Sequence, residues 1–173
     1  RCARWTAPTK PKPSSRCSSS TARHTIGHGR WRWPHAGAPR SWPPEESWRL
    51  LSENPDAVLV DCRTDAEWRW VGVPDLSGLG RQVVFVEWNH GSTGQHNENF
   101  VADLIAAGVA PGERPVVFLC RSGNRSIPAA EAATAAGIAP SYNMLDGFEG
   151  QLDEQGHRGS NGWRALGLPW KQS

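Results

Sequence analysis

Short apolar runs recur along the chain after residue 56, and each is bounded by polar or turn-forming residues. Runs of this length that are rich in Val and Phe are typical of strands buried on both faces. They predict strands over residues 57–63, 82–88, 115–120 and 141–145.

Helical patterns separate these strands. Residues 43–55 are amphipathic and lie between prolines, and residues 65–70 provide one or two helical turns. Residues 97–108 repeat apolar side chains at helical spacing, and residues 126–137 carry a proline in the first turn after a capping serine. Strands that alternate with helices predict an α/β domain, with a mainly parallel central sheet flanked by helices on both faces. Ligands of such sheets bind beyond the carboxyl ends of the strands.

The first 44 residues differ in composition from the rest of the chain. They contain nine Lys or Arg residues and no acidic residue, whereas residues 45–173 contain ten basic and seventeen acidic residues. They follow neither the helical nor the strand period and are rich in Arg, Pro, Ser, Gly and Trp. We therefore expect residues 1–42 to be a basic leader, disordered or non-native, and residues 43–173 to form a single domain.

Two other interpretations of the leader remain open. An acid-free segment rich in Arg and Ser is also typical of a transit peptide. A basic arm in which Trp31 and Trp33 are available for stacking also suits a nucleic acid. We favour the disordered or non-native leader, so a nucleic acid partner is not expected.

Composition excludes several classes of protein. The sequence has no apolar stretch of about 18 residues, the length that a membrane span needs. Four cysteines, at positions 2, 17, 62 and 120, are too few and too uneven for a disulfide scaffold, and none lies in a CxxC or Cys/His motif. We expect a reduced thiol protein of the cytoplasm that needs no metal, no cofactor and no membrane.

The stretch VVFLCRSGNRS, residues 116–126, ends an apolar strand on Cys120 and leads through a loop into a helix. A helix N-terminus, neighbouring arginines and successive backbone N–H groups stabilise an anion and favour the thiolate form of a cysteine. We therefore predict that Cys120 is the catalytic nucleophile; a buried, inert thiol is the alternative. We expect Arg125 to direct its guanidinium group or its backbone N–H toward an anion bound there. The residues predicted to bind the substrate are Arg121, Ser122, Gly123, Asn124, Arg125 and Ser126.

The segment CRSGNRS resembles the active-site loop of the rhodanese family of sulfurtransferases. Residues 59–75 resemble an upstream signature of the same family. The positions that match this signature are Asp61, Arg63, Glu67, Trp68, Gly72 and Pro74. A later family motif is matched only in part, because Phe148 replaces a glycine and Leu152 stands at a tryptophan position. The resemblance runs from about residue 43 to the end, where the chain is similar to a bacterial single-domain subgroup.

The resemblance implies a thiosulfate sulfurtransferase. Cys120 would attack the outer sulfur of thiosulfate, expel sulfite, hold the sulfur as a persulfide and pass it to cyanide or to a thiol. The partners implied are therefore a small-molecule sulfur donor and acceptor. A persulfide carrier or binding module that serves a protein partner is the alternative.

The length of the loop separates sulfur chemistry from phosphate chemistry. Protein phosphatases that share the rhodanese fold have five residues between the cysteine and the closing arginine, whereas four residues separate Cys120 from Arg125. The shorter loop resembles the sulfur-handling branch. A phosphatase is therefore the less favoured function.

Asp61 and Arg63 flank Cys62 on one predicted strand, so their side chains share a face and Cys62 points to the other. The resemblance implies that Asp61 and Arg63 brace the catalytic loop, and an ordinary salt bridge is an equal alternative. We interpret Cys62 as a small core residue, with a resolving thiol as the alternative.

Four further side chains are candidates for binding. His90 and His96 flank a polar loop without other ligands at metal-binding spacing, so we expect solvated loop histidines. We expect Trp163 and Trp170 to pack in the core, with a surface for a protein partner as the alternative.

Overall fold

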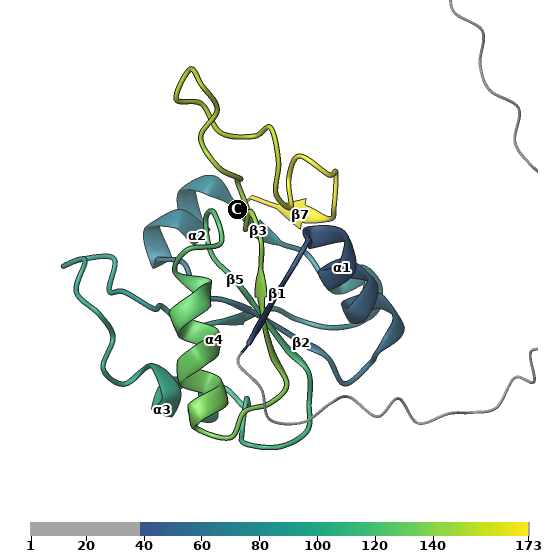
Figure 1. Cartoon of the computed structure of the whole chain (residues 1–173), viewed down its shortest axis with the longest axis vertical. Coiled ribbons are helices and arrows are strands. Elements are labelled where there is room, and N and C mark those ends of the chain that lie inside the picture. Colours follow the sequence, from purple (N-terminus) through teal and green to yellow (C-terminus); the bar gives the residue numbers. More distant parts are fainter. Residues whose placement is uncertain (1–38, 173) are drawn as a thin grey trace, which may run out of the picture. The chain divides into compact units, whose positions relative to one another are not determined.

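The computed structural model describes residues 39–172, and this part of the chain contains a central sheet of five parallel strands (Figure 1). Their order across the sheet is β1-β6-β5-β2-β4. The strands are β1 (Arg40–Trp42), β2 (Val58–Asp61), β4 (Val84–Phe85), β5 (Val116–Leu119) and β6 (Ser141–Met144). A separate antiparallel pair joins β3 (Val73–Pro74) to β7 (Trp170–Lys171).

Four α-helices and one 3-10 helix accompany the sheet in the described residues. They are α1 (Pro44–Glu53), α2 (Asp65–Val71), α3 (Phe100–Ala106), α4 (Ser126–Ala135) and the 3-10 helix η1 (Ser77–Leu79). Figure 1 shows α3 and α4 together on one side of the sheet and α1 on the other, which confirms the predicted α/β fold. Over residues 39–172, every helix is too short or too polar to cross a membrane.

Alternate residues of β2 and β5 divide the core into two layers. Val60 and Phe118 pack with α3 and α4 on one face. Leu59 and Leu119 pack with α1 and the carboxyl-terminal segment on the other face. Because both faces of these strands are buried, their apolar runs are continuous rather than alternating.

The strands at the periphery of the sheet depart from the sequence prediction. β4 comprises only Val84 and Phe85, although a strand was predicted over residues 82–88. β4 lies at the edge of the sheet and pairs with β2 over two residues only. The apolar run at residues 82–88 is therefore longer than the strand that forms there. β1, β3 and β7 were not predicted, because strands of two or three residues show no period and form only against partners that are distant in sequence.

The domain begins before residue 43, which corrects the predicted boundary. Residues Arg40–Trp42 pair with β6 in parallel. The ring of Trp42 stacks on Tyr142 with centroids 4.1 Å apart. The amide Nδ2 of Asn143 donates a hydrogen bond of 3.0 Å to Oγ of Ser41. The interpretations of the leader, including those that involve Trp31 and Trp33, fall outside the described residues.

Two truncations should separate β1 from the leader. Deleting residues 1–38 is expected to leave the melting temperature unchanged, because this segment carries no apolar period. Deleting residues 1–42 is expected to lower the free energy of unfolding by about 1–3 kcal/mol, because it also removes the pairing of β1 and the aromatic stack. Thermal and urea denaturation beside the full chain measure both effects. A loss of stability on deletion of residues 1–38 would show that the leader packs on the domain.

The two tryptophans near the carboxyl terminus differ in burial. Trp163 is fully buried, and its Nε1 donates to the carbonyl oxygen of Pro169 at 2.8 Å, which confirms the core prediction. Trp170 is 38% exposed, so the prediction of core packing is wrong for this residue. It lies on the two-stranded ribbon of β3 and β7, and the guanidinium group of Arg164 lies 4.3 Å from the centroid of its ring.

Candidate active site

Cys120 lies at the carboxyl end of β5, and residues 120–126 (the Cys120 loop) connect it to the first turn of α4. Its Sγ accepts a hydrogen bond from the backbone N–H of Gly123 at 3.2 Å. The hydroxyl of Ser126 also lies 3.2 Å from Sγ. The residue is 1% exposed, so only a small group that enters the loop reaches the sulfur. Two donors aimed at one sulfur favour a negative charge on that atom.

Ser126 lies beside Cys120 but is not the helix cap that the sequence predicted. The sequence predicted it as the N-cap of α4, but the structure places Arg125 at the cap and Ser126 at the first helical position. Its hydroxyl lies 2.6 Å from Oδ1 of Asn143 in β6. Because a hydroxyl has one proton, Ser126 donates either to Asn143 or to Sγ of Cys120 at a given moment. The serine therefore belongs to the site rather than to the helix cap.

The segment after β6 packs against the backbone of the Cys120 loop. Gly147 has a φ of +56°, and a Cβ at this position would lie 2.2 Å from the carbonyl oxygen of Cys120 and 2.8 Å from the nitrogen of Ser122. The N–H of Phe148 donates to the same carbonyl oxygen of Cys120 at 2.8 Å. The two segments are therefore in backbone contact, which only glycine at position 147 permits.

The remaining residues of the Cys120 loop differ in burial. Ser122 and Gly123 are buried, whereas the side chains of Arg121 and Asn124 are exposed. The carbonyl oxygen of Ser122 accepts a hydrogen bond from the side chain of Gln151. The fold therefore brings all the predicted loop residues around Cys120, and leaves two polar side chains open to solvent at its rim.

The guanidinium group of Arg125 binds a carboxylate of its own protein. Nη1 and Nη2 donate to Oε2 and Oε1 of Glu67 at 2.8 and 2.6 Å. Glu67 also closes a capping box with Thr64 at the start of α2. The expected direction of this guanidinium group, toward a bound anion, is therefore corrected: a bidentate carboxylate already satisfies it. Its positive charge still lies close enough to attract the thiolate of Cys120.

The pair of Glu67 and Arg125 is ionised at neutral pH. Burial alone would raise the pKa of Glu67, but hydrogen bonds from Arg125 and from the backbone of Thr64 outweigh it and lower the pKa from 4.5 to about 2. Burial would lower the pKa of Arg125, but the hydrogen bonds and the charge of Glu67 raise it. Folding therefore favours the charged form of both groups, and the pair fastens α2 to the Cys120 loop.

This pair should make stability depend on pH. Because the pKa of Glu67 is depressed on folding, its contribution is complete above about pH 4.5 and is lost as the pH falls toward about 2. The full shift corresponds to about 3 kcal/mol, and screening by solvent reduces this to about 2 kcal/mol. We expect Glu67→Gln to destabilise the protein at pH 7 and to abolish this part of the acid-induced loss. Urea unfolding across the pH range measures it, with the exposed Glu154→Gln as the matched control. Parallel curves for the two variants would contradict the assignment.

Asp61 and Arg63 form a fully buried ion pair, with Nη2 2.6 Å from Oδ2. Arg63 also donates to the carbonyl oxygen of Gly72 at 2.8 Å. Its guanidinium group lies 4.1 Å from the centroid of the Phe148 ring. Since the N–H of Phe148 binds the carbonyl of Cys120, the pair reaches the loop through this residue. That Asp61 and Arg63 brace the Cys120 loop stays a prediction, and Phe148 is the residue through which they would act.

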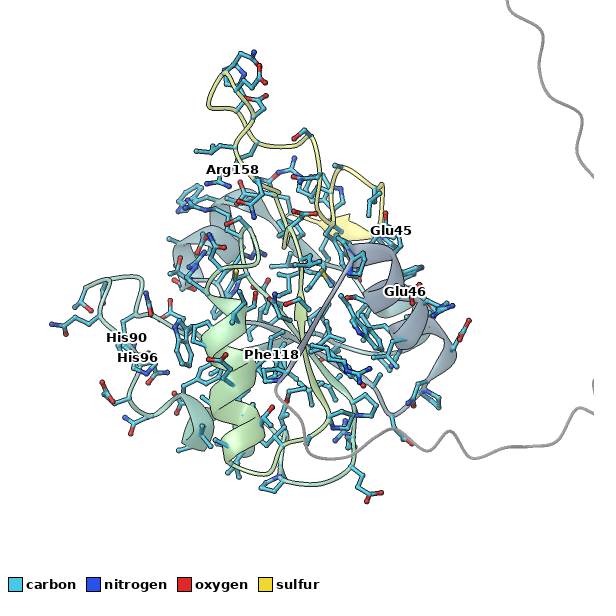
Figure 2. The ribbon with its side chains drawn as sticks, in the orientation of Figure 1. Glu45, Glu46, His90, His96, Phe118 and Arg158 are labelled. Carbon is cyan, nitrogen blue, oxygen red and sulfur yellow. The ribbon has the colours of Figure 1, made fainter. Side chains whose placement is uncertain are left out.

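The other candidate side chains lie apart from the site. Cys62 is fully buried in the core, as interpreted from the sequence. Figure 2 shows His90 and His96 on a loop that extends away from Phe118 at the centre of the sheet. Both histidines are exposed, as predicted for loop residues. In residues 39–172, no group of three His, Cys, Asp or Glu side chains is placed to hold a metal ion.

Three residues of the site were not among the predicted site residues. Glu67 was recognised only as a match to a family signature, although its place three residues after Thr64 is a capping-box signal. Gly147 follows an aspartate directly after a strand, which indicates a turn but not what the turn supports. Asn143 has no sequence signal, because its role depends on β6 lying beside β5.

Comparison with known proteins places this geometry in a family. Residues 42–173 match the family described as the STR4 middle domain. The chain belongs to this family. An uncharacterized protein of Rickettsia conorii is 35% identical over 126 residues, which cover 73% of this chain and 92% of that protein. The rhodanese-like domain-containing protein 4, chloroplastic, of Arabidopsis thaliana is 28% identical over 135 residues, which cover 76% of this chain and 26% of the plant protein.

Solved structures show the same fold. The crystal structure of Rv0390 from M. tuberculosis is 60% identical, with a TM-score of 0.73, and the match covers 79% of this chain and 100% of that one. The polysulfide-sulfur transferase homodimer from Wolinella succinogenes is 24% identical, with a TM-score of 0.53 and coverage of 79% and 80%. The family member described here therefore has the rhodanese-like fold that the sequence predicted.

Proposed function

We propose that this protein is a sulfurtransferase that carries sulfane sulfur as a persulfide on Cys120, with thiosulfate or a related compound as the donor. The observation that carries the proposal is the N–H of Gly123, which donates to Sγ, together with the hydroxyl of Ser126, which lies within hydrogen-bond distance of the same atom and can donate to it in place of Asn143. Such donors stabilise both the attacking thiolate and the terminal sulfur anion of a persulfide. The reaction requires no metal and no organic cofactor.

The reaction has two halves. The thiolate of Cys120 attacks the outer sulfur of thiosulfate, the bond between the two sulfur atoms of thiosulfate breaks, and sulfite leaves with the electron pair. A thiophilic acceptor such as cyanide or a thiolate then attacks the outer sulfur of the persulfide and restores the thiolate. Since both halves use one residue, the kinetics should be ping-pong.

Mass spectrometry of the protein after incubation with thiosulfate tests the proposal. One sulfur atom should be added to the peptide that contains Cys120, and cyanide should remove it. Efficient hydrolysis of p-nitrophenyl phosphate without uptake of sulfur would instead favour a phosphatase, and it would overturn the inference from the four residues between Cys120 and Arg125.

A protein thiol is the second candidate acceptor. Ile127 and Leu145 are each 40% exposed. Ile127 directly follows Ser126, and the backbone of Leu145 lies against Gly123, so two exposed apolar residues adjoin the Cys120 loop. Exposed apolar side chains beside a site suit a protein acceptor more than a small anion such as cyanide. The cytoplasm is the compartment we propose, because the chemistry requires a free thiol.

A further inference from the structure

Cys62 and Cys120 occupy neighbouring positions on two paired strands. The parallel pairing of β2 with β5 places Asp61 opposite Leu119. The N–H of Cys62 donates to the carbonyl oxygen of Leu119 at 2.8 Å, which continues the parallel pattern by one residue. The next pair in this register is Cys62 and Cys120.

The two thiols lie on the same face of the sheet. Both belong to the apolar cluster that packs beneath α3 and α4, and both are free. Neighbouring strands lie about 4.8 Å apart, which falls within the Cα separation of about 4.4–6.8 Å that a disulfide spans. The thiol of Cys62 donates to the carbonyl oxygen of Leu119 at 3.2 Å, so its sulfur is directed toward β5 and not away from it.

Cys62 is held in its protonated, thiol form. Burial raises the pKa of Cys62 well above its ordinary value, and the negative charges of Cys120 and Asp61 raise it further. A protonated thiol is a poor nucleophile. The resting site therefore keeps one reactive sulfur beside one unreactive sulfur, and loss of the charge on Cys120 would remove one cause of this difference.

We propose that Cys62 is a resolving thiol, which forms a disulfide with Cys120 after a hydroperoxide has oxidised Cys120 to a sulfenic acid. In the first step the thiolate of Cys120 attacks the OH oxygen of the hydroperoxide and the O–O bond breaks, which leaves Cys120 as a neutral sulfenic acid. The other oxygen departs with the electron pair as hydroxide or alkoxide and takes a proton from water. In the second step the sulfur of Cys62 attacks the sulfur of Cys120 and the S–O bond breaks. The departing hydroxide takes the proton of Cys62 and leaves as water. With hydrogen peroxide, two thiols are oxidised to one disulfide and one peroxide is reduced to two waters.

This disulfide goes beyond sulfur transfer, since it requires only that Cys120 reacts as a thiolate. Its consequence is protection of the site. A sulfenic acid without a nearby thiol is oxidised further to sulfinic and sulfonic acids, which dithiothreitol does not reverse, whereas a disulfide is reduced readily. The fully buried position of Cys62 restricts this chemistry to Cys120, because other oxidised sulfurs cannot reach it.

The test uses the full chain with Cys2→Ser and Cys17→Ser, which leaves Cys62 and Cys120 as the only thiols. After one equivalent of hydrogen peroxide, digestion with trypsin under non-reducing conditions should yield residues 50–63 joined to residues 82–121. The joined species should have lost two hydrogens, and dithiothreitol should separate it. Oxidation of Cys120 to the sulfinic acid with Cys62 still free would overturn the proposal. Because the readout is the mass of these peptides, it is independent of whether the protein transfers sulfur.

Cys62→Ser is the matched variant, because its hydroxyl can still donate to the carbonyl oxygen of Leu119. At the peroxide dose that oxidises the parent reversibly, we expect the irreversibly oxidised fraction of Cys120 to rise by about fivefold or more in this variant. Cys62→Ala gives the same comparison if the serine variant does not fold. Equal recovery of free Cys120 by dithiothreitol in the parent and in the folded variant would show that Cys62 does not resolve the oxidised site.

Discussion

Replacing Cys120 by Ser is expected to lower the rate of thiocyanate formation from thiosulfate and cyanide by about 10³-fold or more. A serine hydroxyl is a far poorer nucleophile than a thiolate at neutral pH, and it cannot carry a persulfide sulfur. The fold should be retained, because the shorter hydroxyl occupies the same place and can accept from the N–H of Gly123. The added sulfur should also disappear from the mass of the protein after incubation with thiosulfate.

Cys62→Ala is the matched control for this experiment, since Cys62 is the other buried cysteine of the described residues. Removal of one sulfur from the core should cost about 1 kcal/mol of stability. The rate of sulfur transfer should remain that of the parent, because Cys62 has no part in the two half-reactions. If sulfur uptake survived in Cys120→Ser but were lost in Cys62→Ala, the nucleophile would be Cys62 and not Cys120.

Gly147→Ala is expected to destabilise the protein by about 3–5 kcal/mol and to disrupt the Cys120 loop. The added Cβ would stand 2.2 Å from the carbonyl oxygen of Cys120, 2.7 Å from the carbonyl carbon of Arg121 and 2.8 Å from the nitrogen of Ser122. All three are backbone atoms, so relief of the contact must displace the loop itself. Urea unfolding measures the loss of stability, and uptake of sulfur from thiosulfate measures the loop.

Gly167→Ala separates the collision from the strain of the backbone. Gly167 has a φ of +67°, close to the +56° of Gly147, but a Cβ there would have no atom within 4 Å. The control should therefore cost only the left-handed conformation, about 1 kcal/mol. Similar losses in the two variants would mean that Gly147 is required for its φ and not for its contact with the Cys120 loop.

The fold class and the position of Cys120, the proposed nucleophile, follow from local signals. The continuous apolar runs at 57–63 and 115–120 indicate buried strands because their two faces meet helices, and the structure confirms both strands with shorter bounds. Cys120 stands where such a run meets loop formers and a helix start, and the structure places it at the carboxyl end of β5. Strand period, turn residues and helix starts depend on neighbours within a few positions, so the sequence alone reveals them.

The partners of the site depend on contacts between distant segments. The carboxylate that binds Arg125 belongs to Glu67, 58 positions earlier, and Gly147 supports the loop only because the chain returns to it after β6. Cys62 is a core residue by its local pattern, yet it neighbours Cys120 because β2 lies between β4 and β5 and pairs with β5 in this register. Strand order and the closure of long loops are decided by the burial of the whole sheet, and no local pattern encodes which strand lies beside which. The sequence by itself therefore determined the α/β fold and the position of Cys120 at the end of a buried strand. Tertiary structure alone decided the carboxylate, the glycine and the second thiol that surround it.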